Sequence, residues 1–256
     1  MKKMKCFFFQ KAIIPVYCFP LFLTQNGYSK AGFETDTIHT TGGTLEMVFI
    51  GHGTLLFKFN NLVIHVDPVS GEADYSVLPK ADIILVTHQH GDHFDISAIH
   101  KILKENTKVI LTEKCFENAE DLINTIILKN GENTDIYGIS IEAVPAFNIK
   151  HMRSAGNPFH PKGEGNGYIL TFGDKKVYIA GDTENTPEMK TLQDIDIAFL
   201  PMNLPYTMTP EMVADAAKAF RPKILYPYHF GNTKVEKLAE LLKDEEGIEV
   251  RIRNLK

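Results

Sequence analysis

The stretch LVTHQHGDHFD, residues 85–95, packs three histidines and an aspartate into six positions after a continuous apolar run typical of a buried strand. Only 10 of the 256 residues are histidine, so a chance cluster at this place is improbable. Alternate residues of an extended loop point the same way, so His88 and His90 can converge on one ion while Asp92 and His93 turn toward another. The pattern predicts a metal site. Imidazole and carboxylate suit zinc best, with manganese or iron as alternatives.

Strands and helices alternate in two coarse halves. In the first, the runs TLEMVFI, TLLFKF and LVIHVD predict an antiparallel meander. The buried strand ADIILVT follows, then a helix with apolar residues at Ile96, Ile99 and Leu103, then the strand TKVILT.

The second half repeats the scheme with the strand GISIEAVPA, a hairpin turning at Gly173 and Asp174, the strand DIAFLP and the strand KILYPYHF. We expect a helix over residues 210–220 and a final helix from Val235, opened by a capping box of Thr233 and Glu236. The halves predict one α/β domain over residues 32–256, with two sheets face to face and helices outside.

The first residues form a separate segment. Lysines at positions 2, 3 and 5 precede an apolar stretch and a small-residue site ending at Ala31, which indicates a secretory signal peptide over residues 1–31. The expected location is then the periplasm, and otherwise the cytoplasm. An amphipathic strand or helix is the alternative, because Lys11 and Pro15 interrupt the apolar run. The run is too short for a stable transmembrane helix.

Charge argues against a nucleic-acid partner. The formal net charge is −5, and loss of residues 1–31, with five lysines and no acid, would make it −10. Phosphate recognition depends on lysine and arginine, and no basic run follows residue 31. The same processing would leave Cys115 alone, so the mature chain has no internal disulfide.

The motif THQHGDH resembles the H-x-H-x-D-H signature of the metallo-β-lactamase superfamily. Three later or earlier segments are similar to that family in the right order: LVIHVDP, ending in Asp-Pro, VYIAGDT, ending near the bridging aspartate, and YPYHF, ending near the last histidine ligand. The resemblance covers roughly residues 45–252. It implies a four-layer αββα sandwich of two mixed sheets.

The resemblance also implies the metal ligands. His88 and His90 would hold the first metal, and Asp182 would bridge both metals. The second metal would be held by Asp92, His93 and His229.

The third histidine of the first metal departs from the family pattern. Relatives place it directly after the EAVPA strand, where this chain has Asn148. The following loop offers His151 and His160 instead. We favour His160, because it lies between a proline and a glycine-rich segment that can bend the backbone toward the metals.

Four other residues are candidates near the site. His52 is expected beside the pocket or in a surface turn, and Asp67 either accepts a hydrogen bond from a ligand histidine or caps a turn. Tyr206 and Met208 lie in a loop that resembles one beside the active site, with core packing as the alternative.

The implied activity is hydrolysis of an ester, lactone or phosphodiester bond of a small molecule, by a hydroxide shared between two divalent metals, with Asp92 and Asp182 as catalytic residues. The pattern looks most like the branch with sugar-phosphate lactonases and N-acylphosphatidylethanolamine phospholipases, and unlike true β-lactamases. A di-iron redox protein and a non-catalytic binding protein are the alternatives. Di-iron relatives usually have the pattern H-x-E-x-D-H, whereas this chain has His-Gln-His, with Gln89 between its first two histidines. The oligomeric state stays open.

Overall fold

The computed structural model describes residues 32–119 and 121–256, so the predicted signal peptide lies outside the described residues and stays a prediction. The first sheet has seven strands in sequence order. They are β1 (Glu34–Thr40), β2 (Gly43–Gly51), β3 (Thr54–Phe59), β4 (Leu62–Val66), β5 (Ile83–Leu85), β6 (Lys108–Leu111) and β7 (Thr125–Ile127). Strands β1 to β4 pair antiparallel, as the predicted meander requires, and β4 to β7 pair parallel.

The second sheet repeats this scheme. Its strands are β8 (Asn133–Ile136), β9 (Ile139–Ala146), β12 (Gly165–Phe172), β13 (Lys175–Ile179), β14 (Ile197–Pro201), β15 (Ile224–Tyr228) and β16 (Glu249–Val250). Strands β8, β9, β12 and β13 pair antiparallel and β13 to β16 pair parallel. The predicted hairpin is confirmed, because Phe172 pairs with Lys175 across Gly173 and Asp174. A small hairpin of β10 (Met152–Ser154) and β11 (Asn157–Pro158) was not expected.

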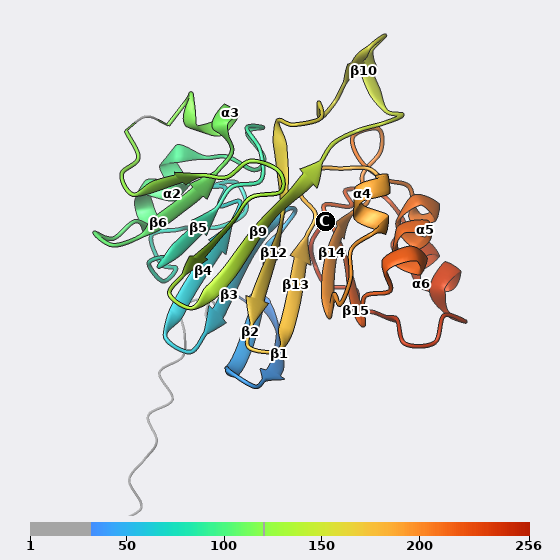
Figure 1. Cartoon of the computed structure of the whole chain (residues 1–256), viewed down its shortest axis with the longest axis horizontal. Coiled ribbons are helices and arrows are strands. Elements are labelled where there is room, and N and C mark those ends of the chain that lie inside the picture. The colour runs from blue at the N-terminus through green and yellow to red at the C-terminus, as the bar shows by residue number, and fades with distance from the viewer. Residues whose placement is uncertain (1–31, 120) are drawn as a thin grey trace, which may run out of the picture.

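Helices cover the outer face of each sheet (Figure 1). Beside the first sheet lie α2 (Ile96–Ile102) and α3 (Glu113–Phe116), and beside the second lie α4 (Pro187–Lys190), α5 (Pro210–Phe220) and α6 (Glu236–Leu242). The predicted four-layer α/β sandwich of two mixed sheets is therefore confirmed. None of the helices in the described part of the chain has the length and apolar character to span a bilayer.

The core forms because alternate residues of a strand face opposite sides of its sheet. In β2, Met47 and Phe49 enter the core between the two sheets, whereas Val48 and Ile50 pack with the core beneath α2. Between the sheets, the Phe57 ring lies 6.1 Å from that of Phe172. Burial on both faces leaves the central strands rigid at the edge where the polar loops begin.

The sequence predicts the start of α5 correctly and the cap of α6 incorrectly. Thr209 caps α5, with its side chain accepting a hydrogen bond from the amide of Met212 at 3.2 Å. The capping box predicted for α6 is wrong. That helix starts after Val235, and no side chain caps it. The amide of Thr233 instead donates to the carbonyl of Phe230, so Thr233 belongs to a turn that precedes the helix.

Candidate metal centre

The candidate site lies where parallel strands of both sheets end. Asp67 follows β4, the His88 loop follows β5, Asp182 follows β13, and His229 follows β15. The chain turns sharply at these points, since Asp67 and His229 have positive φ angles of 44° and 47° and Gly181 has one of 64°. Non-glycine residues rarely adopt this conformation, and they cluster at functional sites.

Asp182 occupies the centre of the histidine cluster. Its Oδ2 atom lies 3.2 Å from Nε2 of His160, 3.5 Å from Nε2 of His229 and 3.9 Å from Nε2 of His88. Its other oxygen, Oδ1, lies 3.4 Å from Nε2 of His93. One buried carboxylate thus faces four imidazoles that come from both sheets.

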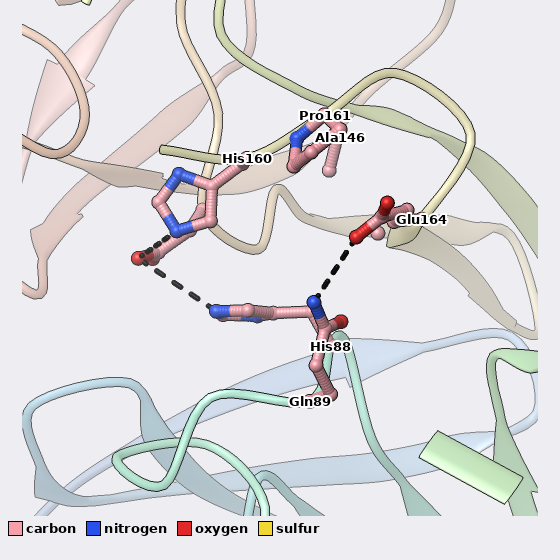
Figure 2. A pocket seen from close by; sticks show the side chains of 8 residues that line it. His88, Gln89, Ala146, His160, Pro161 and Glu164 are labelled. Carbon is pink, nitrogen blue, oxygen red and sulfur yellow. Dashed lines mark hydrogen bonds and ion pairs between the residues drawn. The ribbon is translucent and has the colours of Figure 1, made fainter. Parts of the chain in front are cut away.

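The first group of donors contains His88, His90 and His160, whose ligand nitrogens lie within 4.8 Å of one another. His88 and His160 both face Oδ2 of Asp182, and the two rings are labelled in Figure 2. The intervening Gln89 turns away from the cluster, and its Nε2 atom donates to Glu164 at 3.2 Å. Gln89 therefore lies on the other side of the chain from the two histidines. The extended loop expected up to His93 is wrong, because the amides of His93 and Phe94 both donate to the carbonyl of His90 and close a turn there.

The second group contains Asp92, His93 and His229, with His52 beside them. Oδ2 of Asp92 lies 3.6 Å from Nε2 of His229 and 3.3 Å from Nε2 of His52. The His52 ring is 3.7 Å from the His229 ring, centroid to centroid, and the carbonyl of His52 accepts from the amide of His229. His52 thus stands in the turn between β2 and β3, with its ring packed against the second group.

Asp67 fixes the orientation of the His93 ring through a hydrogen bond with Nδ1. Its Oδ2 atom accepts hydrogen bonds from Nδ1 of His93 at 2.8 Å and from the hydroxyl of Thr87 at 2.6 Å, and its Oδ1 atom accepts from the amide of Thr87 at 2.7 Å. This arrangement puts the proton of His93 on Nδ1 and leaves Nε2 with a free lone pair toward Asp182.

Asn148, the departure from the family pattern, supports His160. Its Oδ1 atom accepts hydrogen bonds from Nδ1 of His160 at 2.7 Å and from the amide of His160 at 2.8 Å. Its Nδ2 atom donates to the carbonyl of Tyr206 at 2.8 Å and to Glu184 at 3.2 Å. Asn148 therefore turns Nε2 of His160 toward Asp182.

The buried carboxylate of Glu184 fixes the backbone of the same loop. It accepts from the amides of Ile149, Lys150 and His151 at 2.7 to 3.0 Å. These bonds outweigh the effect of burial and lower the pKa of Glu184. The sequence prediction missed Glu184, although it stands two residues after Asp182 in the same loop.

The structure does not bring His151 into the cluster. Its Nδ1 atom lies 2.8 Å from Oε1 of Glu184 instead. Of the two histidines weighed for the first group, only His160 faces Asp182.

The electrostatics of four residues of the cluster favour the protonation states that bind metal. Burial, and then neighbouring charge, lowers the pKa of His88 and of His90 below the ordinary value. Burial would raise the pKa of Asp92 and of Asp182, but nearby histidines outweigh it and lower both. Neutral imidazoles and ionised carboxylates are the forms that bind metal.

Several buried nitrogen and oxygen atoms of the cluster have no hydrogen-bond partner among the described residues, and their chemistry indicates whether a metal ion fits here. Nε2 of His93, both ring nitrogens of His229 and Oδ1 of Asp182 make no hydrogen bond within the described structure. Leaving such atoms unsatisfied costs about 1–3 kcal/mol each. Each is an imidazole nitrogen or a carboxylate oxygen, as zinc requires, so the donor set fits divalent metal ions.

A cleft of about 320 Å³ opens over the cluster, lined by His90, Asp92, Arg153, Phe159, His160, Asp182, Asn203, Tyr206 and His229. Tyr206 is 44% exposed and contacts Phe159 edge-on, with 5.1 Å between the ring centroids. Met208 is fully buried in the core, which is the packing alternative considered for it.

Comparison with known proteins agrees with this geometry. Residues 46–229 match the beta-lactamase superfamily domain. The UPF0173 metal-dependent hydrolase of Thermococcus kodakarensis is 32% identical over 198 residues, covering 73% of this chain and 84% of that protein. A crystal structure from Parabacteroides distasonis ATCC 8503, provisionally described as a metal-dependent hydrolase, is 50% identical with a TM-score of 0.82 and covers 88% of this chain and 100% of that one.

The fold also occurs in a protein with redox chemistry. CmlA, a diiron beta-hydroxylase from Streptomyces venezuelae, has a TM-score of 0.66 and 15% identity, and the match covers 84% of this chain and 54% of that one. At this identity the likeness concerns the fold alone.

Proposed function

This chain belongs to the beta-lactamase superfamily, and from that premise we propose that it is a hydrolase that uses two divalent metal ions, preferably zinc, on an ester, lactone or phosphodiester bond of a small molecule. The position of Asp182 carries the proposal. Its Oδ2 atom faces His88, His160 and His229, while its Oδ1 atom faces His93. A carboxylate between two groups of imidazoles is placed to bridge two ions.

In this proposal the first ion is held by His88, His90 and His160, and the second by Asp92, His93 and His229. When bound, such a pair of ions supplies Lewis acidity and a hydroxide near neutral pH.

Side chains of the protein orient the histidines of the site and accept a proton during the reaction. Asp67 fixes the tautomer of His93, and Asn148 fixes that of His160. Asp92 is 53% exposed at its side chain and lines the cleft, so we assign it the role of accepting a proton from the reacting water. His52 lies 3.3 Å from Asp92 and can pass that proton toward solvent.

A di-iron redox role is less consistent with the donor set. The cluster gives five imidazoles in its two groups against two carboxylates, and His90 stands where the di-iron pattern H-x-E-x-D-H has a carboxylate. A donor set composed mostly of imidazoles is common in catalytic zinc sites.

Metal analysis tests the proposal first. We expect elemental mass spectrometry of residues 32–256, purified without chelator, to find two equivalents of zinc or manganese per chain. Asp182→Asn should lose at least one equivalent and hydrolysis of ester, lactone and phosphodiester substrates, whereas Asp135→Asn, which removes an exposed carboxylate, should keep both. Two equivalents of iron, or full activity in the Asp182 variant, would refute it.

A further inference from the structure

We propose that Arg153 forms an anion-binding subsite in the cleft, so that the preferred substrates carry a carboxylate or phosphate group at a distance from the bond that is cleaved. This inference rests on the proposed function, because it defines the substrate class of the same site.

Arg153 contributes the one permanently cationic side chain among the described residues that line the cleft. It stands on β10 and is exposed. Its guanidinium lies over the face of Phe159, with Cζ 5.2 Å from the ring centroid. Phe159 is held in turn by the edge-on ring of Tyr206. The aromatic pair therefore supports the guanidinium on one face and leaves its N–H groups free at the edges.

No carboxylate of the described residues neutralises Arg153. Each of the other arginines, Arg221, Arg251 and Arg253, pairs with an acidic side chain. Arg153 has no such ion pair within residues 32–119 and 121–256, although the chain is acidic overall. An unpaired guanidinium at a cleft is suited to bidentate binding of a carboxylate or phosphate.

A second polar group shares the cleft. Asn203 lines it, and its side-chain amide makes no hydrogen bond to the described residues, since the bonds of Asn203 to Tyr206 and Thr207 all involve its backbone. Asn203 can donate to the same anion or to a neutral oxygen of the substrate.

The base of the loop that carries Arg153 is fixed to the metal centre. The amide of Asn148 donates to the carbonyl of His160 at 2.9 Å, and the amide of His160 donates back to Oδ1 of Asn148. Glu184 holds the backbone from Ile149 to His151. The hairpin therefore starts and ends at the ligand cluster, which sets Arg153 at a defined separation from the reacting bond.

Matched esters test this assignment. The probes are 4-nitrophenyl hemiglutarate, the 4-nitrophenyl ester of 3-phosphonopropanoic acid, and methyl 4-nitrophenyl glutarate as the neutral counterpart. For Arg153→Met we expect the ratio of kcat/KM for the anionic esters to that for the neutral ester to fall about tenfold, the lower end for charge-assisted hydrogen bonds because the side chain is exposed. Arg153→Lys should give a ratio between that of the wild-type protein and that of Arg153→Met.

Lys101→Met is the matched control, because it removes one positive charge from the exposed surface of α2, outside the cleft, and should keep the wild-type ratio. A ratio unchanged in Arg153→Met would overturn the proposal. A larger loss for the phosphonate than for the carboxylate would assign the subsite to phosphate, and the reverse to carboxylate.

Binding separates this inference from the proposed function. If the wild-type protein with its metals cleaves none of the three esters, the hydrolase proposal fails for this substrate class. Calorimetric titration with glutarate and with propylphosphonate then decides the subsite. Weaker binding of either anion to Arg153→Met than to Lys101→Met supports it, and equal dissociation constants refute it.

Discussion

The side-chain oxygen of Asn148 lies 2.7 Å from Nδ1 of His160, so the residue that interrupts the family pattern orients the loop histidine that faces Asp182. We expect Asn148→Ala to weaken metal binding about 10- to 100-fold, the usual cost of losing the partner of a ligand histidine. Competition with a chromophoric chelator measures this affinity. Asn185→Ala, which changes an amide bonded to Asp215 outside the cluster, is the control and should bind as wild type. Wild-type affinity in Asn148→Ala would show that His160 needs no such support.

Substitution of the two loop histidines should have opposite results. His160→Ala removes a nitrogen 3.2 Å from Asp182, and we expect loss of about one metal equivalent. His151→Ala removes a ring that faces Glu184, and should keep both equivalents. Elemental mass spectrometry of the two variants, purified in parallel, makes the comparison. Metal loss confined to the His151 variant would mean that the loop rearranges when metal binds.

Gly53 lies against His93, and a side chain there should disturb the second group of ligands. A Cβ atom at Gly53 would lie 2.6 Å from Cε1 of His93, whose other side is fixed by Asp67. We expect Gly53→Ala to lose metal from that group and to lower hydrolysis. Gly91→Ala is the matched control, because a Cβ at Gly91 has no described atom within 4 Å. Equal metal content in the two variants would contradict this steric argument.

The stability of chelator-treated protein should fall with rising pH. Burial disfavours the charged ring of His93, but Asp182 and Asp67 outweigh it and raise its pKa to about 9. A folded-state pKa above the unfolded value of about 6.5 gives stability that is complete below pH 6.5 and is lost as the pH rises toward 9. We expect the free energy of unfolding to decrease by about 1 kcal/mol per pH unit in this window.

Urea unfolding between pH 6.5 and pH 9 measures that slope, with His93→Gln as the control. The variant lacks the titrating ring, so its slope should be shallower. Identical slopes in both proteins would assign the pH dependence to other groups.

The sequence by itself determined the layered fold and the places where ligands would stand. Apolar runs of strand length define the buried strands, and the H-x-H-x-D-H spacing at the end of one of them marks the loop of the cluster. The shape of that loop was not predicted, because the amides of His93 and Phe94 both donate to the carbonyl of His90 and close a turn. Asp182 could be proposed because the segment VYIAGDT resembles the one that ends near the bridging aspartate in the metallo-β-lactamase superfamily.

Only the tertiary structure decided which loop histidine faces the cluster and what holds it. The sequence favours His160 over His151 through the proline and glycines around it. The contacts that orient the two rings come from Asn148 and Glu184, which are brought together by pairing across β9, β12 and β13. Arg153 likewise packs on Phe159, and Phe159 contacts Tyr206, which is too far away in the sequence for a local pattern to predict the contact. Local periodicity encodes strands and helices, whereas contacts between distant loops arise only when both sheets pack.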